Sequence, residues 1–156
     1  MLSKSKIQTQ KFAISLARRL VQANRPEQSR RATIIALHGD LGAGKTTFVQ
    51  GFMKALGVKH HVTSPTFLIV RKYNTPTTYD LRPTTYRNVY HLDLYRIQKP
   101  KELLDLGFKK ILQDPHAIAL IEWPERIKKL LPKNTIWINF EHGKNEKERI
   151  IEVVSG

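Results

Sequence analysis

Residues 32–47 read ATIIALHGDLGAGKTT, and this stretch decides the fold. A short apolar run over 32–37 is followed by a glycine-rich segment that matches the pattern G-x-x-x-x-G-K-[ST] over 39–46. The apolar run has the composition of a buried parallel strand. Glycines let the backbone curl so that successive N–H groups face one centre, which suits phosphate oxygens. The stretch therefore predicts a phosphate-binding loop between a strand and a helix.

Each position of this loop has an expected role in binding ATP with Mg²⁺. The inward-facing N–H groups and the positive end of the following helix attract phosphate oxygens. Lys45 is expected to reach the β- and γ-phosphates, and the Thr46 hydroxyl is expected to be a ligand for Mg²⁺. We therefore predict a chain that binds and hydrolyses ATP. The loop residues expected to contact the nucleotide are Gly39, Asp40, Leu41, Gly42, Ala43, Gly44, Lys45, Thr46 and Thr47.

A phosphate-binding loop of this kind needs an acidic group at the end of a neighbouring strand, to hold Mg²⁺ or its water. Glu122 directly follows the apolar run over 117–121. Asp93 lies in an earlier stretch in which apolar and polar side chains alternate. We predict that Asp93, Glu122 and Lys45 are catalytic, and that Thr46 and Glu122 are the metal ligands.

Strand and helix patterns alternate along the chain, which predicts an α/β fold. We expect one P-loop domain over 1–156, with a mostly parallel central sheet flanked by helices. The segment 74–88 contains Pro-Thr-Thr-Tyr twice and is expected to be a surface insertion. Helices are expected over 7–23, 45–56, 100–112 and 124–131. Strands are expected over 32–37, 66–71, 89–94, 117–121, 135–140 and 149–154.

The composition limits the classes of protein to consider. Lysine and arginine number 27 against 13 acidic residues, so the net charge is +14. Such a field favours anionic partners, but the basic residues are scattered and direct contact with nucleic acid is left open. The absence of cysteine excludes disulfides and cysteine metal sites. We find no signal peptide and no bilayer-length apolar stretch, and therefore expect a soluble cytoplasmic protein.

Several polar and aromatic residues outside the loop have more than one interpretation. In P-loop GTPases the connection that corresponds to VTSPTF is a switch that senses the γ-phosphate, so Ser64 and Thr66 are candidates for that role. A Ser-Pro pair is equally typical of a turn that enters a strand. His91 is more typical of a packed or paired histidine than of a catalyst, and Tyr95 is expected in the core.

Three other nucleotide-related functions remain open. A small-molecule or nucleoside kinase needs an acceptor pocket and usually an arginine-rich lid. In this sequence, only Arg82, Arg87 and Arg96 lie near a plausible lid. A GTPase lacks its base-reading Asn-Lys-x-Asp sequence here. A nucleotide sensor would bind ATP without hydrolysing it, whereas Glu122 and Asp93 favour hydrolysis.

Motifs over 39–47, 63–67, 91–96 and 122–126 occur in an order that resembles one family. They read GDLGAGKTT, TSPTF, HLDLYR and EWPER. The chain is similar to TsaE, formerly YjeE, the bacterial ATPase of tRNA threonylcarbamoyladenosine (t6A) biosynthesis, over roughly residues 7–154.

The resemblance implies a cytoplasmic protein that hydrolyses ATP weakly alone and acts with TsaB and TsaD. That complex modifies adenosine 37 in tRNAs that read codons beginning with A, and the ATPase supports its turnover rather than transferring the group. Contact with tRNA would therefore run through the complex. The family commonly has Phe where Leu92 stands, and the segments 24–31 and 74–88 look longer than usual, which leaves the partner surface open.

The resemblance also implies residue roles beyond the loop. Glu122 would be the second metal-side carboxylate, and Asp93 would be an acid near the γ-phosphate. Trp123 would lie beside the nucleotide. The adenine side would be approached by Thr9, at the start of the first helix, and by Glu125.

Overall fold

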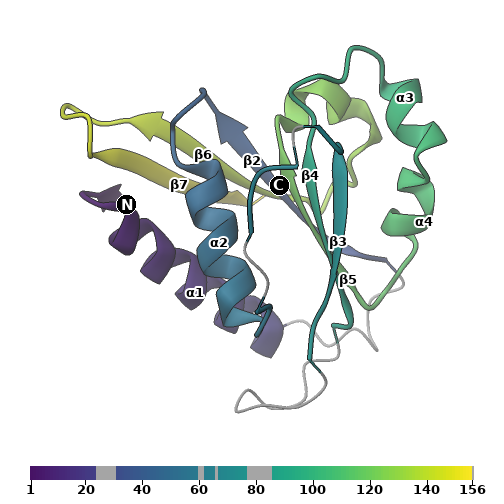
Figure 1. Ribbon diagram of the computed structural model, residues 1–156, viewed down its shortest axis with the longest axis horizontal. Coiled ribbons are helices and arrows are strands. Elements are labelled where there is room, and N and C mark those ends of the chain that lie inside the picture. The colour runs from purple at the N-terminus through teal and green to yellow at the C-terminus, as the bar shows by residue number, and fades with distance from the viewer. Residues whose placement is uncertain (24–30, 60–61, 66, 77–85, 156) are drawn as a thin grey trace.

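The computed structural model describes residues 1–23, 31–59, 62–65, 67–76 and 86–155, which form a sheet between two layers of helices (Figure 1). The strands are β1 (Leu2–Ser3), β2 (Thr33–Gly39), β3 (Val70–Asn74), β4 (Asn88–Asp93), β5 (Ala117–Glu122), β6 (Ile136–His142) and β7 (Arg149–Ser155). The helices are α1 (Lys6–Ala23), α2 (Lys45–Ala55), α3 (Pro100–Asp105), α4 (Phe108–Leu112) and the 3₁₀ helix η2 (Pro124–Leu130). These elements confirm a single α/β domain.

The sheet is mixed, so the expectation of a mostly parallel sheet holds only for its four central strands. Its order is β1-β7-β6-β2-β5-β4-β3. The four central strands are parallel, since β2 pairs with β5 and β6, and β4 pairs with β5. The outer strands are antiparallel: β3 to β4, β7 to β6 and β1 to β7. Only six residues join β6 to β7, which is too short for the crossover that a parallel pair needs.

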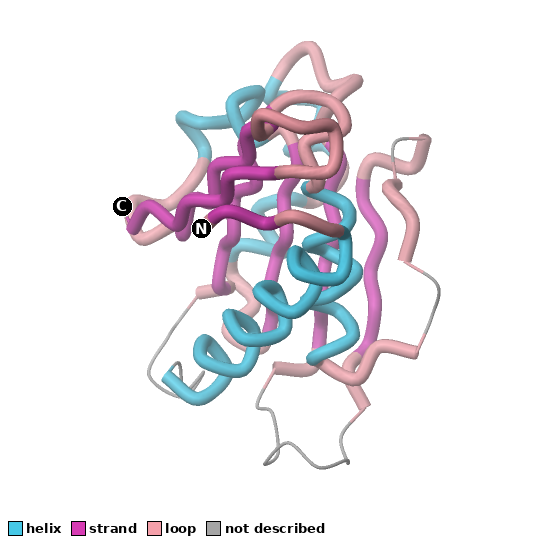
Figure 2. The backbone as a smooth tube through the Cα atoms, turned by 90° about the vertical axis from the view of Figure 1, so that its left-hand side faces the viewer, coloured by secondary structure: helices cyan, strands magenta, loops and turns pink. Residues whose placement is uncertain are grey.

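Because side chains alternate along a strand, the residues of the central strands pack into two separate hydrophobic cores, one on each face of the sheet. Helices α1 and α2 lie side by side on one face of the sheet (Figure 2). Helices α3, α4 and η2 cover the opposite face. On β4, Val89 packs with the α1–α2 side, whereas Leu92 packs with the α3–α4 side. Because side chains alternate, His91 and Asp93 lie on the same face as Val89, as the sequence pattern predicted.

The expected strand over 66–71 is wrong at its start. The described residues before Val70 form a turn, in which the N–H groups of Leu68 and Ile69 donate to the Pro65 carbonyl. Ile69 has a φ of 62°, an uncommon value for a β-branched residue, and such a residue cannot continue a strand. Thr66 and residues 77–85, most of the expected insertion, lie outside the described residues.

The expected helix over 100–112 is two helices. Gly107, with a φ of 85°, ends the first helical segment and starts the second, because glycine adopts the left-handed conformation that terminates helices. The short helix expected over 124–131 is the 3₁₀ helix η2, which ends at Leu130 and has a kink at Ile127. None of the helices within the described ranges combines the length and apolar character needed to cross a membrane.

Candidate functional site

The glycine-rich loop connects β2 to α2, and its conformation requires glycine at several positions. Gly42 and Gly44 have φ values of 75° and 102°, in the left-handed region that glycine adopts without strain. A Cβ atom on Gly39 would lie 2.2 Å from the carbonyl oxygen of Phe140 on β6. Gly44 caps α2 without a side-chain hydrogen bond, so the first N–H groups of the helix can be donated to an anion. The loop thus fits a phosphate group.

Lys45 is almost fully buried at the start of α2. Its Nζ atom donates to the carbonyl oxygens of Gly39 at 2.6 Å and Asp40 at 2.8 Å. Nζ also lies 4.2 Å from the centre of the Trp123 ring. Burial lowers the pKa of Lys45, and the charge of Glu122 opposes that effect. Its acceptors are neutral carbonyls, so a phosphate oxygen would be a stronger partner for the same ammonium group.

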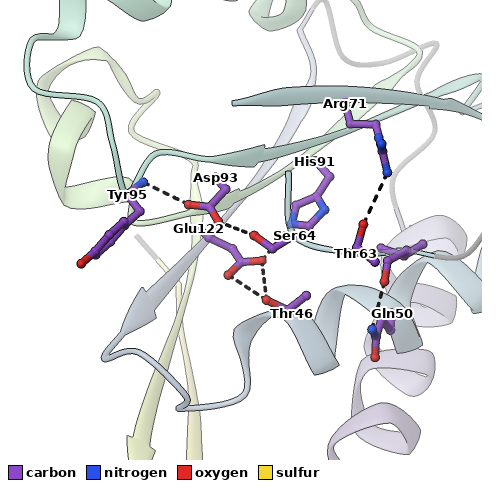
Figure 3. A network of polar contacts seen from close by, with 10 residues as sticks. Thr46, Gln50, Thr63, Ser64, Arg71, His91, Asp93, Tyr95 and Glu122 are labelled. Atoms are coloured by element: carbon purple, nitrogen blue, oxygen red, sulfur yellow. Dashed lines mark hydrogen bonds and ion pairs between the residues drawn. The ribbon is translucent and has the colours of Figure 1, made fainter. Parts of the chain in front are cut away.

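Two carboxylates lie where β4 and β5 end, close to the start of α2 (Figure 3). Asp93 and Glu122 are register partners and are only 4% and 3% exposed. The Thr46 hydroxyl donates to both Glu122 oxygens, at 3.0 Å and 3.1 Å. His91 lies 2.8 Å from Glu122 through Nε2. The sequence prediction that the loop and the two acids share one site is thus consistent with this geometry.

Asp93 is held by the segment that precedes β3. One of its carboxylate oxygens accepts a hydrogen bond from the Ser64 hydroxyl (Figure 3). The other accepts the backbone N–H of Tyr95 at 3.0 Å. The backbone N–H of Asp93 donates to the Ile69 carbonyl at 2.9 Å. Ser64 therefore contacts Asp93, the acid expected near the γ-phosphate. A sensor of the γ-phosphate would need such a contact.

A cavity of about 510 Å³ opens over the loop and the two acids. A second cavity, of about 290 Å³, lies between the loop, α1 and the start of β7. The two share lining residues, so they lie next to each other. The shared residues are Lys6, Gly42, Gly44 and Thr47. Thr9 lines the second cavity, where its hydroxyl is 2.9 Å from that of Ser3.

The aromatic wall of the first cavity consists of Tyr95 and Trp123, whose ring centres are 5.1 Å apart. Tyr95 is 49% exposed, so its expected place in the core is wrong. Trp123 has a φ of 60° and lines the cavity, and its place beside the nucleotide stays a prediction. Glu125 pairs with His38 at 3.1 Å and lines neither the first nor the second cavity.

Two residues of the β6–β7 hairpin contact the outside of the loop, and sequence reasoning missed both. His142 Nε2 lies 3.3 Å from the Leu41 carbonyl oxygen. Arg149 Nε donates to the Gly42 carbonyl oxygen at 3.1 Å. Through these contacts the β6–β7 hairpin holds two carbonyl groups of the loop. No local pattern could have revealed these contacts, because more than 100 residues separate the partners along the chain.

Comparisons with known proteins show which family the chain resembles. The model of the family "Threonylcarbamoyl adenosine biosynthesis protein TsaE" matches residues 3–151. The chain is 34% identical over 125 residues to the tRNA threonylcarbamoyladenosine biosynthesis protein TsaE of Haemophilus influenzae, covering 80% of this chain and 72% of that protein. The protein of the same name from Rickettsia typhi is 40% identical over 115 residues, covering 73% and 72%.

A solved structure is similar over the whole chain. The crystal structure of YdiB from Bacillus subtilis has a TM-score of 0.70 and 25% sequence identity, and the match covers 100% of this chain and 84% of that one. The resemblance that the ordered motifs suggested is therefore confirmed, and the chain belongs to the TsaE family.

Proposed function

We propose that this protein is a Mg²⁺-dependent ATPase that serves tRNA threonylcarbamoyladenosine biosynthesis. The pathway comes from the names of the family and of its relatives. The observation that carries the ATPase assignment is the contact between the Thr46 hydroxyl and the Glu122 carboxylate. It joins the end of the phosphate-binding loop to the end of a neighbouring strand, which is where a metal ion bound to phosphates would need its protein ligands.

The phosphate part of the site uses the loop and Lys45. The N–H groups at the start of α2 and the loop would cradle the phosphates. Lys45 would exchange the Gly39 and Asp40 carbonyls for phosphate oxygens, which are better acceptors because they carry charge. The buried position of Lys45 strengthens this attraction, since little water competes for the ammonium group.

The metal part of the site uses oxygen ligands. Mg²⁺ prefers oxygen and is usually held by one or two protein groups together with substrate phosphates. Thr46 and Glu122 supply a hydroxyl and a carboxylate of this kind. The metal would neutralise charge on the phosphates. The residues present therefore fit the ion.

Asp93 is the group we assign to the attacking water. Hydrolysis of ATP depends mainly on positioning the reactants and on stabilising charge. Asp93 therefore needs only to accept a hydrogen bond from the water and orient it. Its carboxylate is fixed by Ser64 and by the N–H of Tyr95, and it borders the first cavity beside Glu122. Ser64 would then report the presence of the γ-phosphate to the segment before β3.

The second cavity suits the nucleoside. It extends from the loop toward α1, and Thr9 lies in its wall, so Thr9 would approach the adenine from there. We assign no contact to Glu125, which is paired with His38. The partners in the pathway would be TsaB and TsaD, and tRNA would be reached through their complex.

The first test is nucleotide binding and hydrolysis by the purified chain. Calorimetry should show tight binding of ATP that strengthens with Mg²⁺ and meets little competition from GTP. A separate assay should show slow release of phosphate. Lys45→Ala should lose both the ATP binding and the phosphate release. Binding of ATP without any release of phosphate, alone or with TsaB and TsaD, would reject the ATPase in favour of a nucleotide sensor.

A further inference from the structure

His91 is a buried polar residue that the proposed chemistry does not use. It lies on β4 and is completely inaccessible to solvent. Its Nε2 atom is 2.8 Å from Oε1 of Glu122. Its other ring nitrogen, Nδ1, is also buried and finds no hydrogen-bond partner among the residues described. Among the described residues, the side chain of His91 therefore has a hydrogen bond to Glu122 alone, and any effect of His91 on the site would be transmitted through that carboxylate.

These contacts determine which ring nitrogen carries the proton. A carboxylate oxygen can only accept a hydrogen bond, so Nε2 must donate to Glu122. The geometry therefore assigns the proton of this hydrogen bond to Nε2.

The bond to His91 limits the orientations of the Glu122 carboxylate. Oε1 accepts from both His91 and Thr46, whereas Oε2 accepts from Thr46 alone. Thr46 lies on the loop side, and His91 lies on the side of β4. The carboxylate is thus held from two directions. The hydrogen bond from His91 would remain if the Thr46 hydroxyl oxygen became a ligand of a metal ion.

The strand register explains why His91 can reach this position. Asp93 and Glu122 are directly paired across β4 and β5. His91 precedes Asp93 by two residues and so shares its face of the sheet. Strand β4 therefore carries Asp93, which we assign to the attacking water. It also carries His91, which contacts Glu122, the carboxylate assigned to the metal.

We propose that His91 is a positioning residue, which orients the Glu122 carboxylate for Mg²⁺ through an Nε2–H donor. The inference rests on the proposed function, because it assigns a role to Glu122 at the metal. It predicts that His91 affects the affinity for the metal much more than the affinity for the nucleotide, which a purely structural residue would not do.

The test compares two replacements of His91. His91→Phe keeps a ring and removes the donor, whereas His91→Gln keeps a donor at a similar distance from the backbone. Mg²⁺ would be titrated into the complex of the protein with ADP, and ADP affinity would be measured separately in EDTA. We expect His91→Phe to weaken Mg²⁺ binding about 10–100-fold, the usual effect of losing a group that supports a metal ligand.

The controls separate this effect from general damage. His91→Gln should retain most of the Mg²⁺ affinity, and both variants should bind ADP in EDTA like the unmodified protein. His116→Gln, at the opposite end of β5, should change neither affinity. Unchanged Mg²⁺ binding in a folded His91→Phe variant, or equal losses of Mg²⁺ and ADP affinity, would overturn the proposal.

A second measurement needs no ligand, and it uses a variant only to identify the signals of His91. Nitrogen-15 NMR of the histidine side chains should show His91 with a protonated Nε2, its signals being identified by their loss in His91→Gln. An unprotonated Nε2 would overturn the proposal. If instead the unmodified protein binds ADP with no dependence on Mg²⁺, the proposed function fails, while the NMR result still decides the hydrogen bond.

Discussion

Replacing Thr46 by valine removes a single hydroxyl group from the centre of the site and leaves the shape of the side chain almost unchanged. The hydroxyl has one hydrogen, which is shared between the Glu122 oxygens at 3.0 Å and 3.1 Å. It therefore counts as one hydrogen bond to a charged acceptor. Removing such a bond costs about 1.5–3 kcal/mol of stability. Because Glu122 is only 3% exposed, water replaces the lost donor poorly.

That loss has a measurable thermal consequence. A domain of this size loses about 2–4 °C of melting temperature for each kcal/mol, so Thr46→Val should melt about 3–12 °C lower. The assay is thermal unfolding followed by circular dichroism, without nucleotide or metal. Thr46→Ser keeps the hydroxyl and is the matched control, which should lose clearly less.

The same pair of variants tests the metal. Thr46→Val should flatten the dependence of ATP affinity on Mg²⁺, whereas Thr46→Ser should retain it, because the hydroxyl oxygen is the proposed ligand. An unaltered melting temperature in Thr46→Val would refute the reasoning about the buried hydrogen bond. An unaltered Mg²⁺ titration would refute the role of Thr46 as ligand.

Three further substitutions probe other parts of the site. Lys45→Ala should abolish tight ATP binding in calorimetry because it removes the buried cation, and retained affinity would contradict the loop assignment. Asp93→Asn should reduce the rate of phosphate release more than ATP affinity, because its role is to orient water; an equal loss in both would argue against that role. Arg149→Ala should weaken ATP affinity by freeing the Gly42 carbonyl. Lys144→Ala, which removes the same charge from the exposed hairpin, should leave affinity unchanged.

The local part of the site follows well from the sequence. The loop with Lys45 and Thr46 comes from a contiguous motif, since glycine spacing and the following helix are local properties. Asp93 and Glu122 follow from strand patterns that end in a carboxylate. The alternation of apolar and polar residues along β4 also predicts that His91 and Asp93 share one face of the sheet.

The parts that depend on register or on distant contacts were not predictable in the same way. The pairing of His91 with Glu122 requires the alignment of β4 with β5, which no local pattern encodes. Arg149 reaches the loop only because β7 folds back on β6. The two-residue strand β1 is too short to carry a pattern. The break at Gly107, in contrast, had a visible signal in the glycine itself.

The most direct test of the central proposal is to measure ATP hydrolysis and t6A formation in a mixture of this protein, the TsaB and TsaD proteins of the same organism and their tRNA. The account predicts that the partners stimulate hydrolysis, and that repeated rounds of modification need this chain and fail with Lys45→Ala. Full modification supported by Lys45→Ala, or hydrolysis that the partners leave unchanged, would contradict it.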